Sequence, residues 1–214
     1  MTVKTQILKI DPEKADQSHL GAIARVLKGG GVIVYPTETF YGLGANCFDE
    51  KAVRRVYRIK QRPLSKPLPV VVSDLDMIRE IVLEIPPAFE PLISDFWPGP
   101  LTLVLKASPR VPQELQGPSG SIGVRLTGHK WLRSLVEHAS FPVTATSANI
   151  SGGEDVVDPE KATQLFDQKV DLIVDGGETK GLLPSTVLDL SGKKPRIIRE
   201  GAIPLLQLQK YLVS

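Results

Sequence analysis

The chain has a single cysteine, Cys47, among 214 residues, so no intramolecular disulfide can form. One cysteine fits a reducing compartment. The net charge of +2 is too small to indicate an electrostatically driven nucleic-acid binder. No apolar run approaches the roughly 18 residues needed to cross a bilayer, and residues 1–12 lack the apolar core of a signal peptide. We therefore expect a cytoplasmic protein that does not associate with membranes.

Several common binding fingerprints are also missing. The sequence contains neither GxxxxGK[ST] nor a strand-linked GxGxxG, which excludes the usual P-loop and dinucleotide motifs. The histidines (His19, His129 and His138) do not have the spacing of metal ligands. We therefore assign no metal-binding residue, and the sequence does not identify the ligands of a metal ion. Cys47 has no activating base near it in the sequence, which favours a small buried side chain over a nucleophile.

The chain instead has the composition of a globular protein with a core, at 42% hydrophobic and 23% charged residues. Short apolar runs predict strands at 32–35, 68–72, 101–106, 122–126, 143–146, 172–175, 186–189 and 196–199. Helical periodicity predicts helices at 18–28, 49–60, 75–83, 88–96, 130–138, 159–166 and 204–212, with Asp49 as the N-cap of the second. Because helices and strands are interspersed, the class is α/β or α+β, with one large mixed, twisted sheet.

The first unusual segment is PTETFYGLG at residues 36–44, which directly follows a predicted strand. Loops after strands are where α/β folds place ligand-binding groups, and glycines let the backbone approach a ligand closely. A polar turn with a tyrosine packed on the core explains the same residues equally well. The segment by itself does not decide between these two interpretations.

Cations gather at the end of the second predicted helix, where KQRP at 60–63 is followed by Lys66. Such a stretch can hold a polyphosphate, because arginine offers a planar fork and lysine a point charge. Lysines at a helix C-terminus also complement the helix dipole. For this motif taken alone, the dipole is the favoured explanation.

Arg125 lies inside the otherwise apolar strand 122–126. A buried arginine is costly unless it is paired, so this side chain requires a carboxylate, a phosphate or a ligand. No acidic residue lies close by in the sequence. An internal salt bridge and a substrate carboxylate held by the guanidinium fork both satisfy the requirement.

Small hydroxyl and amide side chains occur at two further strand ends. TATSANISGG at 144–153 runs from a strand into a loop, and PSTVLD at 184–189 opens another strand. The last strand ends in IIREG at 197–201, which again places an arginine, Arg199, at a strand end. Small donors and glycines can line a phosphate or nucleotide pocket, and a capped turn is the alternative.

Taken together, these segments resemble the YrdC-like family of threonylcarbamoyl-AMP synthases. The matching segments occur in the family's order and cover most of the chain: PTETFYGLG at 36–44, KQRP at 60–63, KPL at 66–68, WPGPLT at 97–102, GVR at 123–125, TSANISG at 146–152, STVLD at 185–189 and IIREG at 197–201. The resemblance implies one YrdC-like α/β domain over residues 1–214, with a large twisted mixed sheet and flanking helices around a concave basic cavity.

The resemblance also implies an enzyme, a nucleotidyltransferase. It would form threonylcarbamoyl-AMP and pyrophosphate from ATP, L-threonine and bicarbonate or CO2, for the N6-threonylcarbamoyladenosine modification of tRNA. Mg²⁺ is expected to accompany ATP, and tRNA or a downstream transfer complex is the expected partner. By the same resemblance Lys60 and Arg62 are catalytic. The residues expected to face ATP are Lys60, Arg62, Lys66, Ser121, Ser147, Asn149 and Arg199, and those expected to face threonine are Thr39, Arg125 and Ser185.

Three positions depart from the family's pattern. Many relatives carry asparagine at the position of Lys66 and histidine at the position of Val71, near the amino acid. A valine cannot hydrogen-bond a substrate, so any such role must be reassigned. The family's frequent Ser-Pro-Thr after the SAN loop is replaced by EDVV at 154–157, which puts nucleotide contacts from that stretch in question.

Two other functions fit a basic cavity of this kind. A double-stranded RNA-binding module would use it for phosphate contacts, with steeply salt-dependent affinity. The other is carbamoyl transfer from carbamoyl phosphate, as in hydrogenase-maturation relatives.

Overall fold

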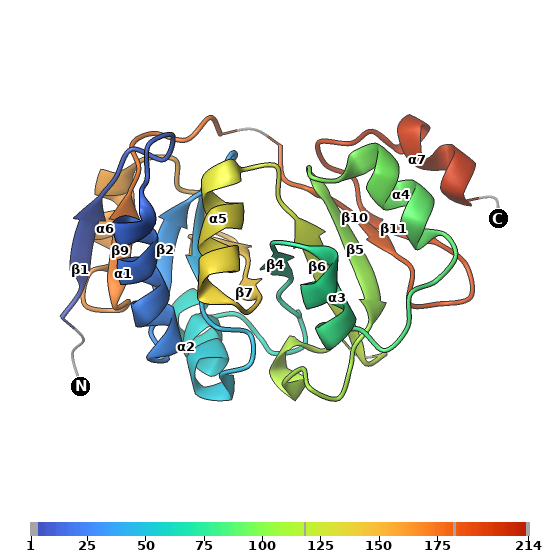
Figure 1. Ribbon diagram of the computed structural model, residues 1–214, viewed down its shortest axis with the longest axis horizontal. Coiled ribbons are helices and arrows are strands. Elements are labelled where there is room, and N and C mark those ends of the chain that lie inside the picture. The colour runs from blue at the N-terminus through green and yellow to red at the C-terminus, as the bar shows by residue number, and fades with distance from the viewer. Residues whose placement is uncertain (1–3, 118, 182, 213–214) are drawn as a thin grey trace.

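The computed structural model describes residues 4–117, 119–181 and 183–212. Its elements alternate between helix and strand along most of the chain, which confirms the predicted α/β class (Figure 1). Within the described residues, every helix is too short or too polar to cross a membrane.

The elements are as follows. The strands are β1 (Gln6–Lys9), β2 (Ile33–Pro36), β3 (Tyr41–Gly44), β4 (Val70–Val72), β5 (Leu101–Lys106), β6 (Ser121–Leu126), β7 (Val143–Thr144), β8 (Thr146–Ser147), β9 (Leu172–Asp175), β10 (Thr186–Asp189) and β11 (Arg196–Arg199). The helices are α1 (Gln17–Lys28), α2 (Glu50–Lys60), α3 (Leu75–Ile81), α4 (Phe89–Phe96), α5 (Lys130–Ala139), α6 (Pro159–Phe166) and α7 (Leu205–Leu212), with one 3₁₀ turn at Gln113–Leu115.

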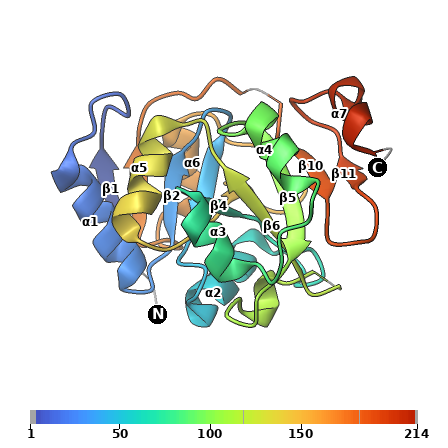
Figure 2. The same cartoon turned by 45° about the vertical axis from the view of Figure 1, so that its right-hand side comes forward.

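The strands form two sheets. One has the order β1-β9-β2-β3-β8 and the other β11-β10-β5-β6-β4-β7. Both contain parallel and antiparallel pairs, so the prediction of mixed strand directions is confirmed. The strands thus form two sheets rather than the predicted single one, and the chain passes from one to the other at Ala145. Before it, β7 pairs with β4, and after it, β8 pairs with β3. In the view of Figure 2, α3 and α4 lie in front of the six-stranded sheet.

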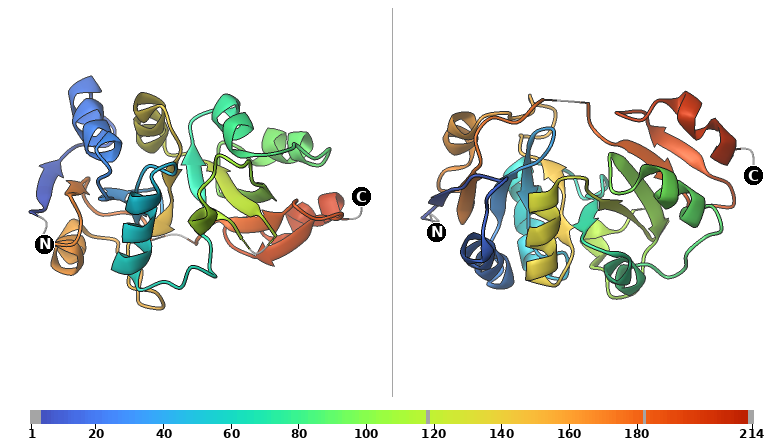
Figure 3. Two further views of the ribbon diagram at one scale, coloured as in Figure 1. Left: turned by 90° about the horizontal axis from the view of Figure 1, so that it is seen from below. Right: turned by 45° about the horizontal axis from the view of Figure 1, so that its top comes forward.

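Helices cover both faces of the five-stranded sheet, with α1 and α5 on one side and α2 and α6 on the other (Figure 3). The strand β2 shows why both layers are needed. Ile33 and Tyr35 pack into the cluster formed with α1 and α5, whereas Val34 packs into the cluster formed with α2 and α6. Successive side chains of a strand point to opposite faces, so the continuous apolar run of β2 is buried on both.

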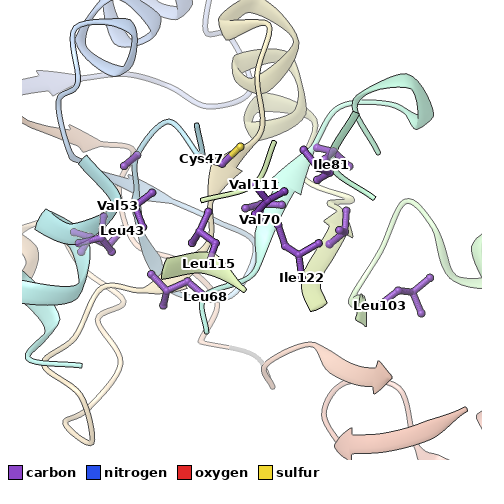
Figure 4. Packing of buried hydrophobic residues seen from close by; sticks show 14 of the residues in the cluster. Leu43, Cys47, Val53, Leu68, Val70, Ile81, Leu103, Val111, Leu115 and Ile122 are labelled. Carbon is purple, nitrogen blue, oxygen red and sulfur yellow. The ribbon is translucent and has the colours of Figure 1, made fainter. Parts of the chain in front are cut away.

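The larger core cluster extends from the five-stranded sheet into the six-stranded one, and Figure 4 shows Leu43, Val70 and Ile122 within it. Cys47 lies in the same cluster, fully buried, and burial raises the pKa of its thiol. A thiol in such surroundings is inert, which agrees with the expectation of a buried structural cysteine.

Periodicity located most elements but not all. The strands β5, β9, β10 and β11 and the helix α6 have the predicted bounds, and Asp49 caps α2 by accepting a hydrogen bond from the Ala52 N–H at 3.0 Å. Two strands were not predicted. One is β1, near the N-terminus, and the other is β3, which lies inside the segment 36–44 that was interpreted as a loop.

The glycines of β3 make room for an aromatic ring of the neighbouring strand. A Cβ on Gly42 would lie 2.8 Å from Tyr35 Cζ, and one on Gly44 would lie 2.6 Å from Tyr35 Cε1. The Tyr35 side chain is fully buried, and its hydroxyl donates to the Thr144 carbonyl at 3.2 Å. At least part of the glycine pattern in this motif therefore serves packing rather than close approach to a ligand.

We expect Gly44→Ala to lower the free energy of unfolding by about 1–3 kcal/mol, because overpacking a filled core displaces rigid neighbours. Chemical denaturation measures the change. Gly192→Ala is the matched control, because a Cβ there would meet only the Lys194 carbonyl at 4.0 Å. Equal stabilities of the two variants would contradict the packing role of Gly44.

Candidate functional site

A cavity of about 270 Å³, the central cavity, lies between the two sheets. The five-stranded sheet contributes the β2–β3 connection and β8, and the six-stranded sheet contributes β4, β6 and the ends of β10 and β11. Segments distant in the sequence therefore meet in one place, and they include most of the motifs that the sequence singled out.

Three guanidinium groups line the central cavity: Arg62, Arg125 and Arg199. Burial lowers the pKa of Arg199, and the neighbouring Arg125 and Arg62 lower it further. Burial also lowers the pKa of Arg62. The cations are thus close enough to repel one another, and an anion placed among them would relieve that repulsion.

Each arginine is oriented by main-chain carbonyls. Arg62 Nε donates to the Lys66 carbonyl at 2.8 Å. Arg199 Nη2 donates to the Ser185 carbonyl at 2.8 Å, and its Nε donates to the same oxygen at 3.2 Å. Neutral acceptors fix these guanidinium groups without cancelling their charge.

Arg125 has in addition a charged partner, Glu38, which comes from the β2–β3 connection. The Arg125 Nη2 donates to Glu38 Oε1, while its Nε donates to the Gly99 carbonyl at 3.0 Å. Thr127 Oγ1 lies 3.3 Å from both carboxylate oxygens. The internal salt bridge that the sequence left as an alternative is therefore present, and its acidic partner is 87 residues away along the chain.

Hydroxyl groups complete the wall. Thr37 Oγ1 accepts from the Thr39 N–H at 3.1 Å and donates to the Phe40 carbonyl at 2.6 Å, which closes a tight turn. Thr39 lines the cavity from this turn. On the opposite sheet, Ser185 Oγ lies 2.9 Å from Thr102 Oγ1.

Lys60 does not line the central cavity. It is 1% exposed, and its ammonium group donates to the Ser147 carbonyl, to the Asn149 carbonyl at 3.0 Å and to Asn149 Oδ1 at 2.6 Å. The Asn149 amide in turn donates to the Gly153 carbonyl and to Asp155. Lys60 therefore holds together the loop that presents Ser147 to the cavity.

The structure brings together most of the predicted site residues. Those that line the central cavity are Thr39, Arg62, Arg125, Ser147, Ser185 and Arg199. Lys60 and Asn149 lie directly behind Ser147. Lys66 is exposed, and Ser121 lies at the opposite end of β6 from Arg125. The ligand roles assigned to all of these residues stay predictions.

Two carboxylates of the cavity, Glu38 and Asp155, received no role from the sequence. Glu38 stood inside a recognised motif, but nothing in the sequence pairs it with Arg125. Asp155 belongs to the stretch that departs from the family's pattern. Val71 also lines the cavity and sits opposite Arg125 in the β4–β6 pair, where it offers only an apolar surface.

This arrangement is suited to binding anions. It combines fixed guanidinium groups, hydroxyl donors and a turn rich in small residues. Among the described residues, no group of three His, Cys, Asp or Glu side chains could hold a metal ion.

The chain is similar to known proteins in sequence and in structure. The family model described as telomere recombination (Sua5/YciO/YrdC) matches residues 25–201. A threonylcarbamoyl-AMP synthase of Pyrococcus abyssi is 37% identical over 94% of this chain, which spans 59% of that protein. A threonylcarbamoyl-AMP synthase of Chromobacterium violaceum is 38% identical over 81% of this chain and 88% of its own length. The structure of Pyrococcus abyssi Sua5 complexed with L-threonine matches with a TM-score of 0.88 and 35% identity, covering 97% of this chain and 60% of that one.

We expect Lys60→Met to lower the free energy of unfolding by about 1–3 kcal/mol, because it leaves buried acceptors of the Ser147–Asn149 turn without a donor. Denaturant titration measures the loss. Lys51→Met on the exposed face of the same helix is the control. A Lys60→Met variant as stable as the control would mean that the buried ammonium group does not hold this loop.

The stability difference between wild type and Lys60→Met should also depend on pH. Burial lowers the pKa of Lys60 to about 8 from its ordinary 10.5, and Arg62 adds to the effect. Between these values the unfolded chain keeps a proton that the folded chain has lost, so the wild type gains stability relative to the variant as the pH rises. Denaturation at about pH 7 and pH 10 tests the sign, and a difference that shrinks with pH would contradict it.

Proposed function

This chain belongs to the Sua5/YciO/YrdC family, and on that premise we propose that it is an L-threonylcarbamoyladenylate synthase. The observation that carries the proposal is the central cavity, where Arg62, Arg125 and Arg199 converge with hydroxyl groups from both sheets. ATP and bicarbonate are anions, and threonine has a carboxylate group. Each substrate of such a synthase therefore presents a negative charge to the cavity.

The proposed reaction has two steps. The neutral amine of L-threonine adds to CO2, derived from bicarbonate, and loses a proton to give N-carboxy-threonine. A carboxylate oxygen of that carbamate then attacks the α-phosphate of ATP, and pyrophosphate leaves. Neither step requires a covalent enzyme intermediate, so the protein's contribution is positioning and charge stabilisation. Because the enzyme would transfer the adenylyl group of ATP, we propose that it is a nucleotidyltransferase.

We assign the nucleotide to the side of the cavity formed by Arg62, Ser147 and Arg199. The two guanidinium groups are fixed by carbonyls and keep their full charge for phosphates. Lys60 and Asn149 support this side by ordering the loop behind Ser147. Their burial argues for a supporting role in the nucleotide site, with Arg62 the residue in direct contact.

We assign the amino acid to the side formed by Thr39, Arg125 and Ser185. The Nε and Nη2 of Arg125 are bonded to Gly99 and Glu38. Its remaining N–H groups have no protein acceptor within the described residues and can receive a carboxylate. Val71 provides an apolar contact nearby, where a methyl group of the substrate can pack.

ATP enters as its Mg²⁺ complex, with the metal carried by the phosphates. The product is a mixed anhydride, which is a reactive acyl donor, so we propose that a tRNA-modifying complex consumes it. That role would place the chain in the cytoplasm, where tRNA and ATP are found. We also propose that residues 1–214 form a single YrdC-like domain.

Threonine-dependent release of pyrophosphate from ATP tests the proposed function, with reactions lacking bicarbonate as the control. A double-stranded RNA-binding module would release none and would bind RNA with a steep salt dependence. A carbamoyltransferase would consume carbamoyl phosphate instead. Absence of threonine-dependent pyrophosphate release from a folded chain would refute the proposal.

We expect Arg62→Gln and Arg125→Gln each to weaken the binding of a different ligand. A charge-assisted hydrogen bond contributes about 1.5–3 kcal/mol, which is roughly 10- to 150-fold in affinity. Arg62→Gln should weaken ATP binding by that factor and leave threonine binding nearly unchanged, whereas Arg125→Gln should do the reverse. Calorimetric titration of each ligand alone measures both, and the same loss for both ligands in both variants would exclude separate subsites.

A further inference from the structure

Glu38 stands at the boundary between two cavities. One is the central cavity, and the other, of about 510 Å³, is the outer cavity, which is lined by Glu13, His129, Lys130 and Glu178 among others. Thr37 and Glu38 line both. The Glu38 carboxylate is therefore open to the central cavity on one side and to a wider opening on the other.

The contacts of Glu38 leave much of its capacity as an acceptor unused. Arg125 donates to one oxygen only, and Thr127 reaches both oxygens at 3.3 Å, which is long for a hydroxyl donor. A carboxylate can accept more hydrogen bonds than these. The side chain is 27% exposed, which leaves it accessible to a substrate.

Arg125 and Glu38 together match the two charges of an α-amino acid. A guanidinium group receives the α-carboxylate and a carboxylate receives the α-ammonium, and in an amino acid these two charges are close neighbours, as Arg125 and Glu38 are here. This ion pair has the charge pattern that a bound amino acid would complete.

We propose that Glu38 is a catalytic residue of this chain: it binds the ammonium group of the amino acid held by Arg125 and removes its proton. The inference rests on the proposed function, since only a reaction at the amine needs this proton removed. An ammonium group has no lone pair and cannot attack CO2, so deprotonation must come before N-carboxylation.

The proton transfer balances without any further reagent. The Glu38 carboxylate accepts a proton from the ammonium group, which leaves a neutral amine and a carboxylic acid. The carboxylic acid releases this proton to solvent through the outer cavity, to which Glu38 is open, and becomes a carboxylate again. The amine lone pair then forms the N–C bond to CO2, and one C=O π bond becomes a C–O⁻. The regenerated Glu38 carboxylate accepts the second proton from the nitrogen and releases it by the same route.

Asp155, the other carboxylate of the central cavity, is less suited to this role. Its Oδ1 accepts from the Asn149 amide at 3.0 Å, within the loop assigned to the nucleotide. Arg125 pairs with Glu38, and the structure gives Arg125 no ion pair with Asp155.

Two ligands separate a role in amine binding from a purely structural one. L-Threonine has a carboxylate, a hydroxyl and an ammonium group, whereas 3-hydroxybutyrate lacks the ammonium group. In calorimetry, Glu38→Gln should weaken threonine binding by about tenfold or more. The same variant should bind 3-hydroxybutyrate more tightly than the wild type, because Arg125 is released from its internal carboxylate.

The pH profile tests the proton transfer. As the pH rises, more threonine in solution carries a neutral amine, so the rate deficit of Glu38→Gln in pyrophosphate release should shrink. Glu38→Asp, which keeps the carboxylate, should recover part of the activity. Glu178→Gln is the matched control, because Glu178 lines the outer cavity but not the central one, and it should match the wild type in both assays.

The proposal is overturned if Glu38→Gln shifts both ligands in the same direction, shifts neither, or keeps a rate deficit that does not change with pH. Circular dichroism and thermal melting of each variant establish that it is folded, and Glu38→Asp supplies the measurement if Glu38→Gln is not. These results are distinguishable from failure of the synthase itself, which would show as a wild type without threonine-dependent pyrophosphate release.

Discussion

The structure depends on how three like charges are kept in one partly buried cavity. Burial lowers the pKa of both Arg62 and Arg199, and repulsion from Arg125 and Arg62 lowers the pKa of Arg199 further. Main-chain carbonyls hold each group in place: that of Lys66 for Arg62, which follows α2, that of Gly99 for Arg125, and that of Ser185 for Arg199. Because carbonyls are neutral, the repulsion is tolerated rather than removed, and the cavity retains its affinity for anions.

The division of the strands into two sheets places these groups opposite one another. A continuous sheet would have spread the β2–β3 connection and the ends of β6 and β10 along one edge. The partner change at Ala145 instead turns the five-stranded sheet against the six-stranded one, so that loops from both face a common space. The same short segment, β7 and β8, carries Ser147 into the cavity, which links the sheet break directly to the site.

Sequence patterns predicted the fold where local signals agree with tertiary packing. The strand β9 and the helix α6 had clear boundaries because an apolar run or a helical repeat was bounded by polar or turn residues. The strand β3 was missed because its glycines, which are poor strand formers, are required by the ring of Tyr35 in the adjacent strand. Arg125 was recognised as needing a partner, but Glu38 could not be identified, since the contact depends on how the two sheets meet.

The balance of charge in the central cavity explains why binding need not distort the fold. Glu38 partly neutralises Arg125 and keeps it oriented before a ligand arrives, whereas Arg62 and Arg199 have only neutral acceptors among the described residues. On the proposed function, an entering polyphosphate would meet Arg62 and Arg199, the latter only partly compensated by Asp155, and an entering amino acid would meet the Arg125–Glu38 pair. The two proposed ligands would then be separated by charge pattern: a net positive side for an anion, and a neutral, dipolar side for a zwitterion. Selectivity of this kind needs no large movement, only the exchange of one internal ion pair for two with the substrate.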